Sequence, residues 1–463
     1  MAGVPAANRH VALIGFMGAG KSTLGAEVAA RLGRRLVEVD REIERRHGTI
    51  PQVFEAHGEA AFRLIEAQQT IEALRSAPPA VISLGGGAVT SADVRSALAE
   101  HALTLLLDVD ADTAWERVRG GDRPLARDEL SFRALHRKRA PVYAEAADAT
   151  VHDADGAVLA AGGIHLGSLE LLGEHVQGPC ALVADAHVLG IHGPAAQVAL
   201  GAKLVSTHEL PVGEEAKTIG SWERLLRELR LGRDGTIVAL GGGCTTDAAG
   251  FAAATYLRGV RWVAVPTTLV GQVDAAIGGK TALNLPEGKN LLGAFHWPAR
   301  TLLDPALLET LPERERRQGT AELVKTRLLA GRELDVRGAA AFKTAVCLRD
   351  PYEQGERAIL NLGHTFAHAL EAGSDHGITH GDAVALGLLA ALRLSGRDTA
   401  PVERELAPEP VAADRERAWA ALGRDKKRAG GEIVLVLLGD EGPYTAPVSE
   451  ADVRRELDRL IAD

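Results

Sequence analysis

The chain has 463 residues, 46% of them hydrophobic and 25% charged, and carries a formal net charge of −10. This length predicts two or three domains, and the negative charge argues against a nucleic acid or an anionic membrane as partner. No uninterrupted apolar run is long enough to span a membrane, and three widely spaced cysteines without a CxxC pair fit a reducing cytosol. We therefore expect a cytoplasmic protein whose partners are small molecules.

The first motif in the chain is a phosphate-binding loop. An apolar run at 10–15 predicts a buried strand, and GFMGAGKST (15–23) follows it and leads into a predicted helix over 21–32. In a G-x4-G-K-S loop, backbone N–H groups and the helix N-terminus surround phosphate oxygens. Lys21 can reach the β- and γ-phosphates, and the Ser22 hydroxyl can bind Mg²⁺. The residues predicted to bind the nucleotide are Gly18, Ala19, Gly20, Lys21, Ser22 and Thr23.

Strand and helix patterns then alternate up to about residue 160. Apolar runs at 36–40, 80–87 and 104–110 predict strands of a parallel α/β sheet. Ligands of such sheets bind at strand ends and in the loops that follow. The polar segment 120–129 has the composition of a lid. The candidate substrate groups are Asp40, Arg63, the glycines 85–87, Arg139 and, in the lid, Arg123. Each of the charged residues, taken alone, is more often a surface charge.

Taken together, these motifs are more specific. GFMGAGKST, VDREIE, GEAAFR, LGGGAV, RPL and KRAPVY occur in this order, and the region resembles shikimate kinase over nearly its whole length. The resemblance implies transfer of a phosphoryl group from ATP, with Mg²⁺, to the 3-hydroxyl of shikimate. Asp40, Arg63, Gly86 and Arg139 would hold shikimate. Asp40 would also orient the attacking hydroxyl or take its proton, while Arg123 would close over the phosphate. In two departures, Glu38 stands where the family has Asp, and the lid is slightly short.

The first domain is expected to end near residue 158. Between 153 and 167 the pattern loosens into small and polar residues. The closing helix that the kinase resemblance leads us to expect is not indicated there. We therefore assign 1–158 to the kinase-like domain.

The next part again has an α/β pattern. The run 180–189 predicts a strand that ends at Asp185, and 235–256 predicts a strand, a glycine turn and a helix. The turn is not G-x-G-x-x-G, so it fits either a nucleotide site or a tight turn between packed elements. Several polar residues are expected in the loops that follow, namely Thr267, Thr268, Asp274, Lys280, Lys289 and Asn290. Such a group favours a site for a polyhydroxylated anion.

From about residue 311 the pattern becomes helical and contains a histidine cluster. The stretch 361–380 carries His364, His368, His376 and His380, together with Glu371. The first two are spaced i,i+4, so one helix face could present both imidazoles to a metal ion. Packing or capping explains this stretch equally well on its own. A helical domain that faces the nucleotide domain is expected.

A second resemblance rests on motifs between 211 and 438. They are GGGCTTDAAGF, YLRGV, PTTLVGQVDAAIGGKTALN, KNLLGAF, LPERE, GTAELVK, LNLGHTFAHALE, THGDAVALG and DKK, and this set is similar to 3-dehydroquinate synthase. It implies an NAD-binding domain over 159–310 and a helical metal- and substrate-binding domain over 311–463. The implied reaction converts 3-deoxy-D-arabino-heptulosonate 7-phosphate to 3-dehydroquinate with release of phosphate. NAD⁺ and a divalent ion, Zn²⁺ or Co²⁺, would take part, and a homodimer would form through this half.

The site residues of this half follow from the same resemblance. Those implied to bind NAD⁺ are Asp185, Glu214, Lys217, Gly243, Asp247, Thr267, Thr268, Lys280, Lys289 and Thr310. The implied metal ligands are Glu322, His364 and His380, which leaves His368 for proton handling or substrate contact. The implied substrate and phosphate contacts are Arg258, Asp274, Lys280, Asn290, Lys325, Lys343, Arg357, Asn361, His368 and one of Lys426 and Lys427. Among these, Lys325, Lys343, Arg357, Asn361 and His368 are expected to act in catalysis.

The sequence as a whole predicts a bifunctional enzyme of aromatic amino acid biosynthesis. In two departures from the synthase pattern, the chain between Lys325 and Lys343 is several helical turns shorter, and Asp382 stands in place of Glu. Two alternatives stay open. The second half could be another sugar-phosphate cyclase or a polyol dehydrogenase of the same superfold, and a dehydrogenase would release NADH. Alternatively, one half could be a binding module without turnover.

Overall fold

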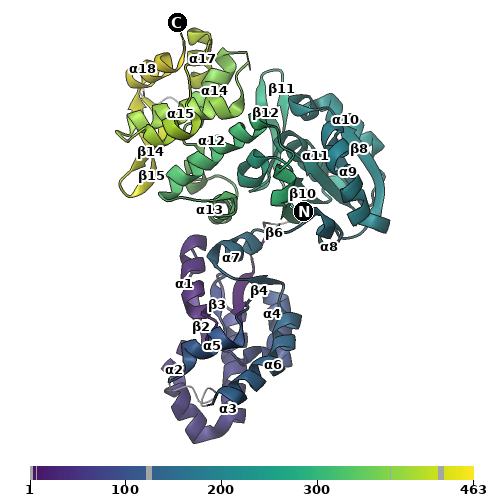
Figure 1. Ribbon diagram of the computed structural model, residues 1–463, viewed down its shortest axis with the longest axis vertical. Helices are drawn as coiled ribbons and strands as arrows, with labels where there is room; N and C mark the ends of the chain where they lie inside the picture. Colours follow the sequence, from purple (N-terminus) through teal and green to yellow (C-terminus); the bar gives the residue numbers. More distant parts are fainter. Residues whose placement is uncertain (1–3, 7, 121–127, 376, 426–431, 463) are drawn as a thin grey trace. The chain divides into compact units, whose positions relative to one another are not determined.

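The computed structural model describes residues 4–6, 8–120, 128–375, 377–425 and 432–462 (Figure 1). The chain divides into two compact units, Val4–Gly163 and Ile164–Asp463. Both contain a parallel sheet covered by helices, so the expected α/β class is confirmed. The domain limits at 158 and 310 stay predictions. None of the described helices combines the length and the apolar character that crossing a membrane requires.

The first unit is built on a five-stranded sheet in which every pairing is parallel. Its strands, in pairing order, are β2 (Leu36–Glu38), β3 (Val81–Ser83), β1 (His10–Ile14), β4 (Ala102–Leu107) and β5 (Ala149–Val151). The helices are α1 (Lys21–Leu32), α2 (Val39–His47), α3 (Ile50–Leu74), α4 (Ala92–His101), α5 (Ala111–Val118), α6 (Glu129–Ala146) and α7 (Ala154–Ala161). The central strand β1 is buried along its whole length, as is typical of a sheet covered on both faces.

Two expectations for this unit were wrong in detail. A closing helix, α7, is present, and the side chain of Asp153 caps it by accepting a hydrogen bond from the backbone N–H of Gly156 at 2.8 Å. Its sequence, ADGAVLAA, is almost entirely small or apolar and therefore lacks a polar face that would reveal helical periodicity. In addition, β2 ends at Glu38, so Asp40 lies in the first turn of α2 and not at a strand end.

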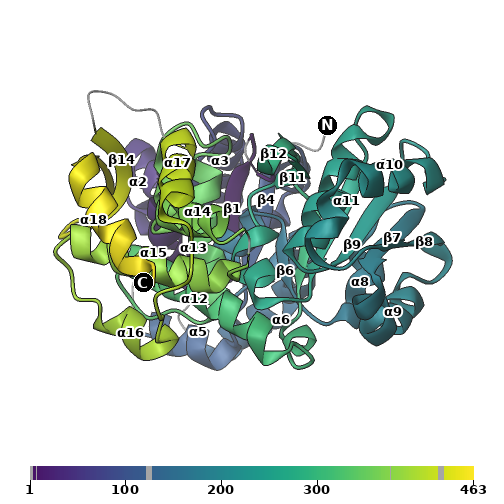
Figure 2. The ribbon, with the colours of Figure 1, turned by 90° about the horizontal axis from the view of Figure 1, so that it is seen from above.

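The second unit contains a six-stranded sheet that is also parallel throughout. Its strands, in pairing order, are β6 (Ile164–Leu166), β13 (Arg300–Leu303), β10 (Arg261–Pro266), β9 (Thr236–Gly241), β7 (Cys180–Asp185) and β8 (Leu204–Leu210). The helices that cover it include α8 (Leu172–His175), α9 (Ala186–Leu200), α10 (Ile219–Glu228) and α11 (Gly243–Thr255). Figure 2 shows α10 and α11 on one side of β7, β8 and β9, and α8 and α9 on the other.

An antiparallel hairpin stands apart from this sheet. It consists of β11 (Lys280–Leu285) and β12 (Gly288–Phe295), and Leu283 pairs with Leu292. The expectation that all the polar residues of this region lie in loops was therefore wrong. Lys280 begins β11, while Lys289 and Asn290 belong to β12. Asp274 lies in a π-helical turn, η6 (Gly271–Ala275), a feature that is frequent at functional sites.

The region after Leu311 is mainly helical, as expected. Its helices are α12 (Glu313–Ala330), α13 (Val336–Arg349), α14 (His364–Gly373), α15 (His380–Leu394), α16 (Ala400–Leu406), α17 (Arg415–Asp425) and α18 (Glu450–Leu460). A second antiparallel hairpin, β14 (Glu432–Gly439) with β15 (Gly442–Ser449), was not anticipated. Its apolar residues Ile433, Leu435 and Leu437 pack into the same core as Phe366 and Leu386 of α14 and α15.

Close packing of α14 on α15 brings the histidine-bearing helix ends together. Gly363 precedes α14 with φ 77°, and a Cβ there would lie 2.8 Å from the backbone nitrogen of Leu388 in α15. Only glycine combines that backbone angle with such a close approach. The hydroxyl of Thr379 caps α15 through the N–H of Asp382 at 3.2 Å. His364 and His380 therefore begin adjacent helices.

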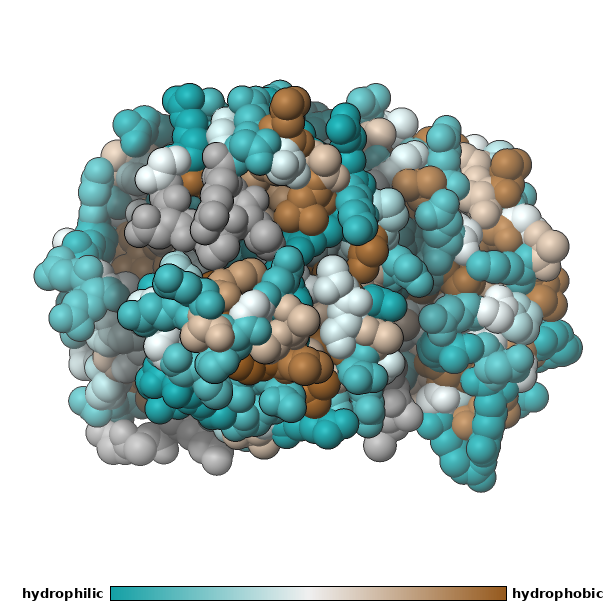
Figure 3. All heavy atoms as spheres, turned by 90° about the horizontal axis from the view of Figure 1, so that it is seen from below, coloured by the Kyte–Doolittle hydropathy of each residue, from teal (hydrophilic) through white to brown (hydrophobic). Residues whose placement is uncertain are grey.

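One face of the surface is drawn in Figure 3 with residues coloured by hydropathy. In the face drawn in Figure 3, hydrophilic residues predominate and hydrophobic ones form small separate patches. Single exposed apolar residues of this kind are normal and define no site by themselves.

Candidate functional site

Three helices contribute to a cluster of potential metal ligands. It consists of Glu322 from α12, His364 from α14 and His380 from α15, whose ligand atoms all lie within 4.8 Å of one another. His380 Nε2 is 3.2 Å and His364 Nε2 is 3.4 Å from Glu322 Oε1. Two imidazole nitrogens and one carboxylate fit a divalent metal site with open positions for substrate. The donor set is therefore suitable for Zn²⁺ or Co²⁺.

His368 lies outside this group of ligand atoms. It is exposed, and its ring is 5.7 Å from that of His364 with the two planes nearly perpendicular. The i,i+4 spacing does place the two rings near each other, but His380 supplies the second imidazole of the cluster.

The cluster lies in a strongly charged environment. Burial lowers the pKa of His380, but its hydrogen bonds with Glu322 and Glu371 outweigh this effect and raise the pKa to about 10. Burial likewise opposes ionisation of Glu322, yet the ammonium of Lys325 and the two imidazoles hold the pKa of that carboxyl well below its usual range. Metal ions bind a deprotonated histidine nitrogen, so metal binding at His380 competes with its protonation.

Next to the cluster, two lysines meet one aspartate. Lys343 Nζ lies 2.6 Å and Lys325 Nζ 3.6 Å from Asp274 Oδ1, and Lys325 also pairs with Glu322. Both lysine side chains are buried. The two ammonium groups overcome the effect of burial and lower the pKa of Asp274 to about 2. The short connection 331–335 between α12 and α13 thus still allows Lys325 and Lys343 to converge.

Glu353, which the sequence did not single out, contacts two of the expected site residues through its carboxylate. Glu353 lies 2.5 Å from Lys280 Nζ and accepts a hydrogen bond from the Asn361 side chain at 3.2 Å. Its backbone has φ 55°, a conformation that is uncommon for a residue other than glycine. Arg357 is buried nearby, with its guanidinium 5.7 Å from the centroid of the Phe295 ring. Nothing in the spacing of Glu353 distinguished it from a surface charge.

The residues expected to bind NAD⁺ gather where parallel strands end. Strands β7, β9 and β10 lie side by side and end at Asp185, Gly241 and Pro266, so the residues that follow share one edge of the sheet. There, the N–H of Thr267 donates to the carbonyl of Gly241 at 3.0 Å. Gly243 begins α11, whose N-terminus points its N–H groups toward this edge.

Charged residues complete this side of the site. Lys217 Nζ lies 2.6 Å from Asp247 Oδ2 and also donates to the Asn290 side chain. The charge of Asp247 offsets the burial of Lys217 and raises the pKa of that lysine. The Glu214 carboxylate accepts from Asn284 at 2.7 Å and lies 3.8 Å from Lys289 Nζ.

The remaining expected residues of this half are less closely grouped. The hydroxyl of Thr310 lies 3.0 Å from Nε2 of His192. Arg258 is exposed in the turn after α11, on backbone with φ 69°. The hydroxyl of Thr268 accepts a hydrogen bond from the N–H of Gly271 at 3.1 Å. Lys426 falls outside the described residues.

In the first unit, the phosphate-binding loop has the expected form. Lys21 Nζ donates to the carbonyls of Gly15 at 2.8 Å and Phe16 at 3.1 Å, which holds the ammonium over the loop. Arg117 of α5, which the sequence did not single out, donates to the carbonyls of Gly18 and Ala19, both at 3.2 Å. Arg117 is thus a second cation, after Lys21, that stabilises the loop conformation through its carbonyl groups.

The expected shikimate-binding residues surround the glycines after β3. The side chain of Arg139 donates to the carbonyl of Gly86 at 3.1 Å. A Cβ on Gly85 would lie 2.7 Å from Asp40 Oδ1, and one on Gly87 would overlap the guanidinium of Arg63. Glycine is therefore required for these side chains to approach the loop. Arg123 falls outside the described residues.

Glu66 joins this group as the partner of Arg63. Their charged atoms are 2.5 Å apart, and the carboxylate is almost completely buried. Burial raises the pKa of Glu66 although Arg63 acts in the opposite direction. The pair fixes the position of the Arg63 guanidinium at the edge of the site.

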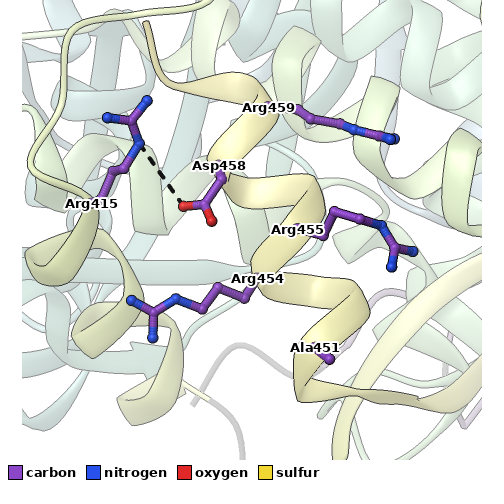
Figure 4. A pocket seen from close by; sticks show the side chains of 6 residues that line it. All are labelled: Arg415, Ala451, Arg454, Arg455, Asp458 and Arg459. Atoms are coloured by element: carbon purple, nitrogen blue, oxygen red, sulfur yellow. Dashed lines mark ion pairs between the residues drawn. The ribbon is translucent and has the colours of Figure 1, made fainter. Parts of the chain in front are cut away.

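A hollow beside α18 is a different kind of feature. It is lined by Arg415, Ala451, Arg454, Arg455, Asp458 and Arg459 (Figure 4). Arg455 pairs with Asp452 and Arg459 with Glu456, both at 2.6 Å. In Figure 4 these two arginines point away from Arg415 and Arg454. Since the guanidinium groups diverge and carry carboxylate partners, the hollow is a network of surface ion pairs.

The fold and the two sites together define two enzyme classes on one chain, a P-loop kinase and a nucleotide- and metal-dependent α/β enzyme. Family models match residues 17–161 to shikimate kinase, 207–318 to the N-terminal part of 3-dehydroquinate synthase and 303–408 to its C-terminal part. The 3-dehydroquinate synthase of Bordetella pertussis is 41% identical over 322 residues, which covers 60% of this chain and 89% of that protein. The chain therefore belongs to the 3-dehydroquinate synthase family and carries a shikimate kinase domain ahead of it.

A further relative and two solved structures are also similar to this chain. The 3-dehydroquinate synthase of Coxiella burnetii (strain Dugway 5J108-111) is 41% identical over 293 residues, with 55% of this chain and 81% of that protein covered. A 2-deoxy-scyllo-inosose synthase, solved with carbaglucose-6-phosphate, NAD⁺ and Co²⁺, has a TM-score of 0.58 at 27% identity and covers 65% of this chain and 96% of its own. The 2-epi-5-epi-valiolone synthase of Streptomyces hygroscopicus, solved with NAD⁺ and Zn²⁺, has a TM-score of 0.54 at 24% identity, with 64% and 94% covered, and shares the fold. The chain thus joins two enzymes of the shikimate pathway.

Proposed function

We propose that Glu322, His364 and His380 hold a divalent metal ion, Zn²⁺ or Co²⁺, at the centre of the synthase site. The observation that carries this proposal is the meeting of three ligand atoms from three helices within 4.8 Å. A metal held there would polarise the substrate oxygens that bind to its open positions. Lys325 contacts both Glu322 and Asp274. It therefore belongs both to the surroundings of the metal ligands and to the pair of lysines at Asp274.

The residues next to the metal ligands bind and orient an anionic substrate. We assign Lys343 and Lys325 to the phosphate and oxyanion groups, because their two buried ammonium groups converge at Asp274 beside the metal ligands and can donate hydrogen bonds to anionic oxygens. Asp274 keeps both ammonium groups in place. Arg357 and Asn361 approach from the turn before α14, and His368 handles a proton at the exposed side of the metal ligands. Asn290, Arg258 and Lys426 complete the proposed substrate contacts.

The proposed NAD⁺ site lies at the ends of strands β7, β9 and β10. NAD⁺ would supply reversible acceptance of a hydride from a secondary alcohol. The N-terminus of α11 at Gly243 would face the diphosphate. The side chains proposed to contact the cofactor are Asp185, Glu214, Lys217, Asp247, Thr267, Thr268, Lys280, Lys289 and Thr310. Lys280 and Lys289 lie on the β11–β12 hairpin, where Lys280 pairs with Glu353 and Lys289 lies 3.8 Å from Glu214.

For the first unit, we propose phosphorylation of shikimate with ATP and Mg²⁺. Lys21 binds the β- and γ-phosphates, and Ser22 binds the metal. Asp40 orients the attacking hydroxyl of shikimate or takes its proton. Arg63 and Arg139 bind the other polar groups of shikimate around Gly86. Arg123 covers the transferring phosphate. Convergence of these groups on the loop after β3 supports this assignment.

The assembly and cellular location are part of the same proposal. We expect a homodimer formed through the synthase half, and a cytoplasmic protein. The cysteines Cys180, Cys244 and Cys347 are free thiols, which suits a reducing compartment.

The experiment that tests the synthase assignment is release of phosphate from 3-deoxy-D-arabino-heptulosonate 7-phosphate by the purified chain. We expect release to require NAD⁺, to stop after chelation and to return with Zn²⁺. NADH should not accumulate, because the hydride returns to the product. Stoichiometric NADH would instead indicate a dehydrogenase, and absence of release with metal and NAD⁺ present would contradict the proposal.

A further inference from the structure

Glu371 is a buried carboxylate at the metal cluster to which the proposed reaction assigns no role. It lies in the last turns of α14, and only 6% of its side chain is exposed. Its Oε1 is 3.1 Å from Nδ1 of His380. The other ring nitrogen of His380, Nε2, is 3.2 Å from Glu322 Oε1. The imidazole is therefore held between two carboxylates, one at each nitrogen.

The two carboxylates have different relations to the cluster. Glu322 belongs to the group of three potential ligands, whereas Glu371 does not. A histidine that binds a metal through Nε2 carries its proton on Nδ1. In that tautomer, the N–H at Nδ1 donates to Glu371. Such a hydrogen bond fixes both the tautomer and the orientation of the ring, and it makes the ligating nitrogen more basic.

We propose that Glu371 is a positioning residue that aligns His380 for metal binding. The inference rests on the proposed role of His380 as a ligand. Glu371 acts through the Nδ1 hydrogen bond and does not itself contact the metal. It therefore sets the affinity and coordination geometry of the site, and through them the rate of the synthase reaction.

The position of Glu371 on its helix follows from helical geometry. His364 and Glu371 are seven residues apart on α14, which is close to two turns and places both on one face. This single face thus supplies one ligand directly and supports a second ligand that begins α15. Packing of α14 on α15 therefore determines both parts of the site.

A lysine of the β11–β12 hairpin approaches the Glu371 carboxylate. Lys289 Nζ lies 3.9 Å from Glu371 Oε1 and 3.8 Å from Glu214 Oε1. An ionised acceptor forms a stronger hydrogen bond than a neutral one. This arrangement favours the histidine tautomer that binds metal.

The test compares metal affinity in Glu371→Gln, Glu371→Ala and the wild-type chain. Glu416→Gln is the matched control, since Glu416 is an exposed carboxylate on α17 that pairs with Arg454. Affinity for Zn²⁺ alone is measured by competition with a chelator, and the visible spectrum of the Co²⁺-loaded protein reports coordination geometry. Unfolding of the metal-free variants shows whether each one folds.

We expect affinity for Zn²⁺ to fall about 10-fold in Glu371→Gln and up to about 100-fold in Glu371→Ala, with an altered Co²⁺ spectrum. The smaller loss in the glutamine variant is expected because its carbonyl oxygen can still accept a hydrogen bond. Glu416→Gln should match the wild type. If the glutamine variant folds and retains wild-type affinity and spectrum, the inference is wrong although the metal site stands. If the wild-type chain binds no metal, both the proposed site and this inference fail.

Discussion

His380 Nε2 lies 3.2 Å from Glu322 Oε1, although 58 positions separate the two residues in the chain. His368, only one helical turn from His364, is not part of the same group of ligand atoms. The composition of the cluster is thus determined by how α12, α14 and α15 pack. Helical spacing within one segment would have selected a different pair.

The first prediction separates the two kinds of histidine. His380→Ala should lose bound metal because it removes one of three ligands, whereas His368→Ala should retain the metal and lose turnover. Metal content after gel filtration, measured by elemental analysis, checks this. Equal metal loss in both variants would show that the ligand set is wrong.

A second prediction concerns the lysine pair at Asp274. Lys343→Met removes the closer cation and should reduce the rate of phosphate release on the order of 10²–10³-fold. The protein should still fold, since Lys325 remains 3.6 Å from the Asp274 carboxylate. Steady-state kinetics with the heptulosonate phosphate measures the effect, and Lys138→Met, at an exposed site of the first unit, is the control. A rate within about twofold of the wild type would exclude a role for Lys343 at the phosphate.

The local motifs of this sequence gave correct information about both parallel sheets. The phosphate-binding loop, the glycine turns and the apolar runs are encoded within short segments, so the strands at β1, β7 and β9 could be placed from them. The hairpin β14–β15 and helix α7 could not. Their residues take these conformations largely through packing against distant parts of the chain, such as α14, α15 and α1.

The same limit applies to the site. Lys325, Lys343 and Asp274 were expected there only as members of a family pattern, and their mutual contacts arise from the fold. Glu353 and Glu371 could not have been assigned partners from the sequence, because an isolated glutamate looks like a surface charge until its burial and neighbours are known.

A third prediction tests the glycine loop of the kinase. Gly87→Ala places a methyl group against the guanidinium of Arg63, which has to move from its position beside Glu66. Displacement of about 1 Å at a binding group can reduce kcat/KM for shikimate about 10²-fold. Binding of ATP should persist, because the phosphate-binding loop is a separate segment. Gly190→Ala, where an added Cβ meets no atom within 4 Å, is the control. Unchanged kcat/KM would contradict the proposed placement of Arg63.

A fourth prediction concerns acid stability of the second unit. Burial lowers the pKa of His165 to about 4, with further contributions from His175 and Arg300, and the two imidazole rings are 4.7 Å apart. Because the folded-state pKa is below the unfolded value, neutral His165 contributes stability above about pH 6.5, and this is lost as pH falls toward 4. His165→Phe should therefore flatten the decline of the urea midpoint between pH 6.5 and 4.5. An identical decline in the variant would rule out His165 as a source of it.

The central claim is that two independent active sites operate on this chain, and parallel assays of both reactions in single variants test it most directly. Lys21→Ala should abolish shikimate-dependent formation of ADP and leave NAD⁺-dependent phosphate release unchanged. His380→Ala should have the opposite effect, because it removes a ligand only from the synthase site. Loss of both activities in either variant, or survival of ADP formation in Lys21→Ala, would contradict the account.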